Sequence, residues 1–221
     1  MATGVFGKLP DQRDYVQHGM DAALMSLVDP WIQSCLQRSR EDLQDAWLGA
    51  YLNAPIWRFW LGPSIIGQTV LGALMPSVDG VGRYFPLMLA SVSDRPFDAP
   101  EIEPQDDWFA QAEELLLAAL AEDGTYSGLL DGAADLPDPV PGVAEWPASP
   151  DCKTALKNHR RTRQQDFYGP LSFWWSPPAA ADDVPTLTHM WRGLPPPQEY
   201  AMLLAVQDTE QPMRSGGGVE C

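Results

Sequence analysis

The side chains best suited to chemistry or recognition are charged residues in two polar loops beside predicted strands. Asp14 lies next to Arg13, and Asp79 lies close to Arg83. Lys8 ends the first predicted strand and completes the candidate set. Exposed charges often only pair with one another or cap a turn, but functional residues also favour loops held by a rigid scaffold. Two interpretations therefore stand, a local salt bridge and a charged partner-binding rim.

Sequence motifs for catalysis are missing. Neither the G-x-S-x-G of a hydrolase nucleophile nor the phosphate loop G-x-x-x-x-G-K-[ST] occurs. Gly80 and Gly82 precede a strand and lack a third glycine at the dinucleotide spacing, so they predict a turn. We expect no catalytic residues, no cofactor and a protein that is not an enzyme.

Metal-ligand spacing is missing as well. The three histidines, His18, His159 and His189, are scattered and have no H-x-x-x-H or H-x-H partner. The three cysteines form no C-x-x-C pair, and Cys35 lies on the apolar stripe of a predicted helix. We expect no metal site, a buried Cys35 and a reducing compartment.

The charge balance narrows the class of partner. The 221 residues include 14 Lys plus Arg and 30 Asp plus Glu, for a formal net charge of −16. Such a field repels phosphate backbones and anionic lipid surfaces, which argues against nucleic acid and membranes. It either keeps the protein soluble or selects a basic partner. No secretory signal or apolar span is visible in the sequence, so we expect a cytoplasmic protein.

Most of the predicted elements that position the charged loops are strands. Runs rich in aromatic and β-branched residues predict strands at 3–8, 56–61, 69–78, 83–92 and 171–176, with a weaker one at 186–192. Short linkers join the second, third and fourth of these strands and favour an antiparallel meander. Pro76 and Pro86 lack an amide donor and should lie at strand ends or bulges.

Three helices accompany these strands. The Asp29-Pro30 pair predicts a helix start, followed by an apolar stripe as far as Trp47. A second helix is predicted over 108–123, after acidic residues that suit its N-terminus. A third should follow Pro195–Pro197. Helices over a mostly antiparallel or mixed sheet make an α/β sandwich, in one domain over 1–208. Residues 123–150 are expected to be an irregular insertion, and 209–221 a disordered tail.

Four segments, in order, resemble the TagF/ImpM family of type VI secretion. They are Gly4–Pro10 with Arg13–Val16; Ala54–Phe59; Leu74–Asp79 with Val81–Leu87; and Phe173–Trp175 with Gly193–Pro195. The resemblance extends over about residues 4–207, although a glycine is usual where this chain has Arg13. It implies a three-layer α-β-α sandwich and an accessory regulator that represses secretion after translation. The implied partner is a forkhead-associated (FHA) scaffold protein, and no catalytic residues carry over.

Two further hypotheses remain open. A layered α/β fold with Arg/Asp loops also suits a small-molecule-binding enzyme of unknown class, although fold alone argues little. The chain could instead be a scaffold that oligomerises through exposed aromatic residues, with Trp174, Trp175 or Trp191 as candidates.

Overall fold

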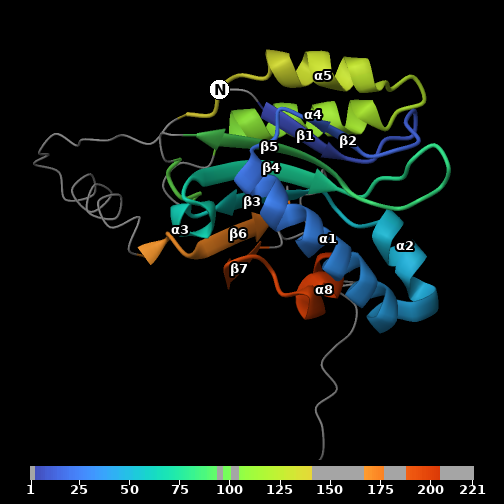
Figure 1. Cartoon of the computed structure of the whole chain (residues 1–221), viewed down its shortest axis with the longest axis horizontal. Coiled ribbons are helices and arrows are strands. Elements are labelled where there is room, and N and C mark those ends of the chain that lie inside the picture. Colours follow the sequence, from blue (N-terminus) through green and yellow to red (C-terminus); the bar gives the residue numbers. More distant parts are fainter. Residues whose placement is uncertain (1–2, 94–96, 101–104, 141–166, 177–187, 205–221) are drawn as a thin grey trace, which may run out of the picture.

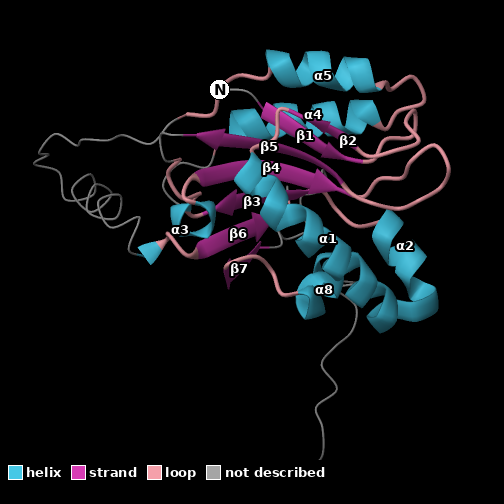
Figure 2. Ribbon diagram, in the orientation of Figure 1, coloured by secondary structure: helices cyan, strands magenta, loops and turns pink. Residues whose placement is uncertain are grey.

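The computed structural model describes residues 3–93, 97–100, 105–140, 167–176 and 188–204 (Figure 1). Its centre is a seven-stranded sheet with the order β2-β1-β5-β4-β3-β6-β7. Every neighbouring pair in this order is antiparallel, so the sheet has the predicted antiparallel character without a parallel pair. Helices lie on both faces of the sheet (Figure 2), which makes the predicted three-layer sandwich.

The predicted strands are confirmed, and one more is present. The strands are β1 Thr3–Gly7, β2 Val16–His18, β3 Trp57–Leu61, β4 Thr69–Met75, β5 Leu87–Ser93, β6 Leu171–Trp175 and β7 Thr188–Arg192. β4 ends directly before Pro76 and β5 begins directly after Pro86, as the missing amide donors require. The meander β3-β4-β5 is confirmed. The short strand β2 is the additional one.

Helices of different length cover the two faces. The α-helices are α1 Ala22–Leu43, α2 Trp47–Leu52, α3 Pro63–Ile66, α4 Asp106–Ala119, α5 Tyr126–Asp135 and α8 Tyr200–Leu204. Two short 3-10 turns, Gln44–Ala46 and Pro197–Glu199, lead into α2 and α8. Helices α1, α2 and α8 contribute to the core on one face, and α4 and α5 to the core on the other.

The first helix begins at Ala22, eight residues before the predicted start at Pro30. Its cap is Asp21, whose carboxylate accepts hydrogen bonds from Ala23 N at 2.8 Å and Leu24 N at 3.0 Å. Pro30 lies inside the helix, where a proline usually costs about 3 kcal/mol. The predicted start was wrong because the buried stripe runs unbroken from Leu24 through Pro30, and burial of that stripe outweighs the local cost.

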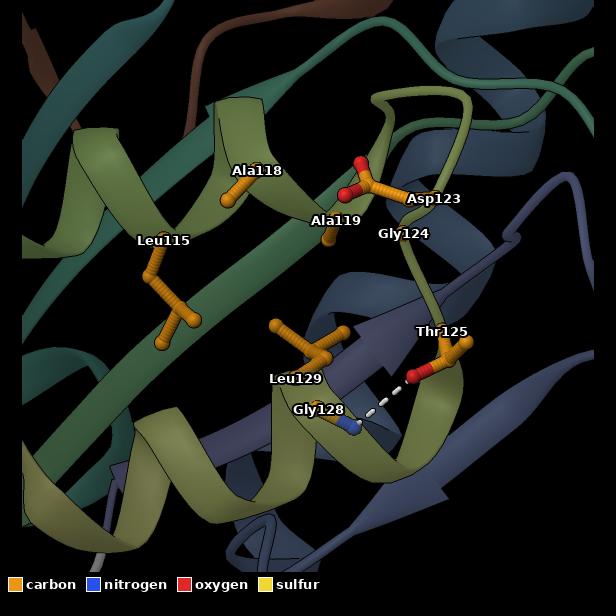
Figure 3. Close-up of a pocket in the computed structure, with 8 residues that line it drawn as sticks. All are labelled: Leu115, Ala118, Ala119, Asp123, Gly124, Thr125, Gly128 and Leu129. Carbon is orange, nitrogen blue, oxygen red and sulfur yellow. Dashed lines mark hydrogen bonds between the residues drawn. The ribbon is translucent and has the colours of Figure 1, made fainter.

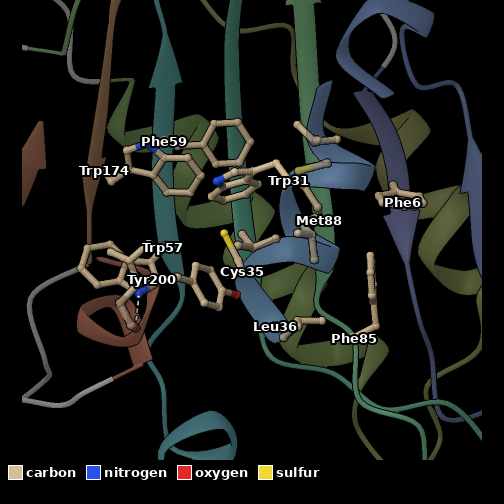
Figure 4. Packing of buried hydrophobic residues seen from close by; sticks show 14 of the residues in the cluster. Phe6, Trp31, Cys35, Leu36, Trp57, Phe59, Phe85, Met88, Trp174 and Tyr200 are labelled. Carbon is tan, nitrogen blue, oxygen red and sulfur yellow. Dashed lines mark hydrogen bonds between the residues drawn. The ribbon is translucent and has the colours of Figure 1, made fainter. Parts of the chain in front are cut away.

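Aromatic residues dominate the core under α1 (Figure 4). Trp174 stacks on Phe59 with ring centroids 4.9 Å apart, and Trp31 lies 5.4 Å from Trp174. The Trp31 indole donates to the Pro195 carbonyl at 2.7 Å, so its polar atom is satisfied inside the core. Cys35 is fully buried as predicted. Trp174 is 1 % exposed, which excludes it as a surface aromatic.

The second core lies under α4 and α5. Arg58 of β3 forms an ion pair with Glu113 of α4 and lies over the Phe109 ring at 5.3 Å. This buried pair fixes α4 to the sheet. In the connection between β5 and α4, Phe97 and Ala99 are fully buried and extend this core.

The prediction of an irregular insertion was wrong for part of 123–150. Helix α5 occupies Tyr126–Asp135, with Thr125 as its N-cap and Leu129 and Ala133 buried. Its two glycines and two aspartates lower the helix propensity, and tertiary packing stabilises the helix in spite of them. Residues 141–166 and the predicted tail 209–221 lie outside the described residues, so the domain boundary at 208 stays a prediction.

A candidate interaction site at the β1–β2 and β4–β5 loops

Two loops meet at one end of the sheet because β1 and β5 are neighbouring strands. The β1–β2 loop carries Lys8, Arg13 and Asp14, and the β4–β5 loop carries Asp79 and Arg83. Residues more than 60 positions apart in the sequence therefore come together. We call these five residues the charged loop cluster.

The β4–β5 loop is built around Asp79. Its backbone N–H donates to the Arg83 carbonyl at 3.1 Å, and its Oδ1 accepts from Val81 N at 3.1 Å and Arg83 N at 2.8 Å. The short side chain thus satisfies the turn's own amides. Gly82 takes φ +85°, the left-handed region that glycine reaches without strain. The Gly80–Gly82 turn predicted from sequence is confirmed.

Beneath the surface, Lys8 and Asp79 form a buried ion pair. Lys8 Nζ lies 2.8 Å from Asp79 Oδ2, and the two side chains are 4 % and 0 % exposed. The same Oδ2 accepts from Arg83 Nε at 2.7 Å. A buried carboxylate is tolerated when charged donors satisfy it, and losing one donor leaves a charge uncompensated.

These contacts determine the ionisation of Asp79. Burial alone raises the pKa of a carboxyl. Here the hydrogen bonds from Lys8, from the backbone and side chain of Arg83 and from Val81 outweigh burial and hold the pKa of Asp79 well below its usual range. The carboxylate therefore stays ionised across the physiological range.

Arg83 connects the buried pair to the surface. Its guanidinium lies 3.6 Å from Asp14 Oδ1 and donates to the Arg13 carbonyl. The Arg83 side chain is 55 % exposed and that of Asp14 is 95 % exposed. The arginine thus ties one loop to the other while one side of it faces solvent.

Uncharged contacts brace the same loops. Ser77 Oγ donates to the Lys8 carbonyl at 2.6 Å, and Gly80 N donates to the Gln12 carbonyl at 2.8 Å. The buried Tyr51 hydroxyl donates to the Ser77 carbonyl at 3.0 Å and accepts from Ser77 N at 3.1 Å. The cluster is consequently held in one geometry from both sides.

Two apolar side chains at this end of the molecule were missing from the sequence-based set. Tyr15 is 51 % exposed and Val81 is 55 % exposed. Tyr15 packs edge-on against Phe85 at 4.8 Å, and Lys8 Nζ lies 4.7 Å from its ring centroid. The signal available in the sequence was the Arg-Asp-Tyr run, since tyrosine and arginine are enriched at interfaces.

The two sequence interpretations are both partly realised. Local pairing is present in the Lys8–Asp79–Arg83–Asp14 chain of contacts. Lys8 and Asp79 are buried, so any role they have in recognition is to position the loops. Arg13, Asp14 and Arg83 remain exposed and form the surface that a partner can reach.

Three hollows among the described residues lie away from the charged loop cluster. The one in Figure 3 measures about 240 Å³ between α4 and α5, and Asp123 contributes its only acidic side chain. Thr125 beside it is already engaged, as its hydroxyl accepts from Gly128 N at 3.1 Å. A second hollow of about 220 Å³ lies near Gly19 and Gln68, and an apolar one of about 10 Å³ beside α8. The charged loop cluster lines none of these three.

The described residues show neither a metal cluster nor a membrane-crossing helix. Within them, no group of three or more His, Cys, Asp or Glu side chains is arranged to hold a metal ion. Across the same residues no helix combines the length and apolarity that a membrane crossing needs.

The fold defines a three-layer α/β sandwich with an antiparallel sheet. Residues 4–136 match the model of the TagF N-terminal domain, described as type VI secretion system-associated. The chain belongs to this family, and its association with type VI secretion follows. PA0076 from Pseudomonas aeruginosa PAO1 has a similar crystal structure, with TM-score 0.77 and 29 % identity over 98 % of this chain and 100 % of that one. A search of curated proteins found no match.

Proposed function

We propose that this protein regulates a type VI secretion system by binding another protein through the exposed side of the charged loop cluster. In this proposal it acts in the cytoplasm, is not an enzyme, and represses secretion after translation by binding an FHA-type scaffold protein. One observation supports the proposal above the others. A buried ion pair and two braced loops hold Arg13, Asp14, Arg83, Tyr15 and Val81 on one surface.

The composition of this surface suits protein recognition. Interfaces are enriched in tyrosine and arginine, and their hot spots combine such anchors with a rim of polar groups. Tyr15 and Val81 supply apolar area, and Arg13 and Asp14 supply charges of both signs. Because the loops are already ordered, binding costs less conformational entropy than ordering a free loop would.

The alternative of a small-molecule-binding enzyme has less support. Ligand pockets usually measure about 300–1,000 Å³ and carry converging polar groups. The hollows of about 240 and 220 Å³ fall below this range and lie away from the Arg/Asp loops. A protein surface better suits the exposed side of the charged loop cluster.

The binding test uses the full chain and the purified FHA scaffold of the same secretion system. Arg13→Ala and Tyr15→Ala should each weaken binding by about tenfold or more, the loss of a hot-spot contact. Arg38→Ala is the matched control, because this arginine is exposed on α1, pairs with Asp42 of the same helix and belongs to neither the charged loop cluster nor β7. A folded wild-type chain that does not bind the scaffold would contradict the proposed partner. Equal affinities for Arg13→Ala and Arg38→Ala would contradict the proposed surface.

The repressing direction is tested in cells. Deletion of the gene should increase effector release, and overexpression should reduce it. Overexpressed Arg13→Ala should repress less than overexpressed Arg38→Ala at equal protein level. Unchanged release after both deletion and overexpression would refute a regulatory role.

A further inference from the structure

Strand β7 forms a border of the sheet and leaves one row of backbone groups facing outward. In the described chain β7 pairs only with β6. Gly193 N donates to the directly opposite Pro170 carbonyl at 2.7 Å, which marks a hydrogen-bonded pair. Such pairs alternate along an antiparallel ladder, so Trp191 and His189 also point their backbone groups toward β6. The backbone groups of the other three β7 residues, Thr188, Met190 and Arg192, therefore point away from the sheet.

The side chains of β7 do little to protect this edge. Natural edge strands are usually guarded by prolines, several charges or a bulge. β7 has no proline, an unbroken register with β6 and a single charged residue, Arg192. Met190 is 57 % exposed at the centre of the strand. An edge with these properties is suited to pairing with another strand.

We propose that β7 pairs in antiparallel fashion with β7 of a second copy of this chain, centred on Met190. In this register Met190 faces the partner subunit's Met190, and Thr188 faces the partner subunit's Arg192. These pairs use the outward backbone groups, and each exchanges two N–H···O bonds. On the other face, His189 lies opposite the partner subunit's Trp191.

This register favours a second copy because the strand is complementary to itself. The only charge on β7 meets a neutral threonine, so no like charges lie directly opposite each other. Met190 meets an equally exposed apolar side chain. His189 already stacks on Trp191 within the chain at 5.3 Å, and the pairing adds the same aromatic contact across the symmetry axis. Among the three tryptophans considered from sequence, Trp191 is the one located at this border.

The expected association is weak and strengthened by salt. One five-residue strand buries less area than the roughly 1,000 Å² of a stable interface. Each copy carries a formal charge of −16, and the resulting repulsion is screened over shorter distances as ionic strength rises. Dimerisation should therefore depend on concentration and increase between about 50 mM and about 500 mM NaCl.

Sedimentation velocity on the full chain tests the pairing, from about 1 µM to about 500 µM. Met190→Asp places two carboxylates opposite each other and should remain a monomer throughout. Met202→Asp is the matched control, because Met202 is 47 % exposed on α8 and the change adds the same charge. The control should dimerise as the wild type does. A wild-type monomer across the whole range at high salt, or equal association of the two variants, would overturn the proposal.

Two proline substitutions distinguish loss of the β7–β7 pairing from loss of folding. Met190→Pro removes an outward N–H and should abolish the dimer with little change in melting temperature. His189→Pro removes an N–H that points to β6 and should lower the melting temperature clearly. Equal destabilisation by both variants would show that the N–H groups of Met190 and His189 do not point in opposite directions. Neither result depends on the charged loop cluster, which lies near the other border of the sheet.

Discussion

Removal of the Tyr51 hydroxyl should loosen the charged loop cluster without disturbing the core. Tyr51 is fully buried, and its ring stacks on Trp47 at 4.9 Å, so Tyr51→Phe keeps the packing. The hydroxyl makes two hydrogen bonds, accepting from Ser77 N and donating to the Ser77 carbonyl. That carbonyl keeps a second donor, Phe85 N at 3.1 Å, whereas the buried Ser77 N–H loses the Tyr51 oxygen as its acceptor.

The magnitude follows from this asymmetry. A buried N–H without an acceptor, as at Ser77, lowers the free energy of unfolding by about 1–3 kcal/mol. The loss at the Ser77 carbonyl is smaller, because that oxygen keeps one donor. We expect Tyr51→Phe to lower the free energy of unfolding by about 2 kcal/mol. For a chain of this size that corresponds to a fall in melting temperature of about 4–8 °C. Urea unfolding should show a lower midpoint with an unchanged slope.

The matched control is the same chemical change at a half-exposed site. Tyr15→Phe also removes a phenolic hydroxyl, but Tyr15 is 51 % exposed. It should change stability by less than about 0.5 kcal/mol. If Tyr51→Phe and Tyr15→Phe had equal stabilities, the Tyr51–Ser77 contact would not brace the loop, and the argument for a preorganised site would fail.

Two further predictions test the ion pair and the core. Because contacts with Lys8 lower the folded pKa of Asp79, its stabilising contribution is fully present above the unfolded pKa of about 3.9 and is lost as pH falls further. The melting temperature of Asp79→Asn should therefore lie below that of the wild type at pH 7 and approach it at acidic pH. The melting temperature of the exposed Asp14→Asn should follow that of the wild type at every pH. A difference between Asp79→Asn and wild type that does not change with pH would contradict the ionised pair. At Gly72 an added Cβ would collide with the Phe59 ring, so Gly72→Ala should destabilise by about 1–3 kcal/mol in urea unfolding. Gly49→Ala in α2 meets nothing within 4 Å and should be neutral or stabilising by up to about 1 kcal/mol, so equal losses at both glycines would refute the packing argument.

Local patterns in the sequence predicted most of the strands and their ends. Aromatic and β-branched runs marked the strands, and Pro76 and Pro86 marked two of their ends because proline has no donor for a ladder. The same local reasoning failed at Pro30, where a continuous buried stripe outweighs the proline penalty. It failed again at α5, where glycines and aspartates hide a helix that packing against α4 stabilises.

The candidate site shows the limit of sequence reasoning more clearly. Its residues were selected as two neighbouring pairs, Arg13–Asp14 and Asp79–Arg83, with Lys8 added from the end of the first strand. The decisive contact joins Lys8 to Asp79 across 71 positions, and it exists only because β1 pairs with β5. Strand order and register are tertiary properties that no local pattern records. Burial of Lys8 and exposure of Tyr15 follow from the same pairing, so neither could be predicted locally.

The sheet order also determines how the two proposed surfaces work together. The charged loop cluster lies by β1 and β5, while β7 is separated from them by β4, β3 and β6. Pairing through β7 therefore leaves both clusters of a dimer open, and one dimer presents two partner-binding surfaces. Against a partner that is itself clustered, two linked sites raise the apparent affinity without a new contact. Met190→Asp should then weaken binding to a dense scaffold surface while leaving binding to a single scaffold molecule in solution unchanged. Equal weakening in both formats would place Met190 in the partner interface instead.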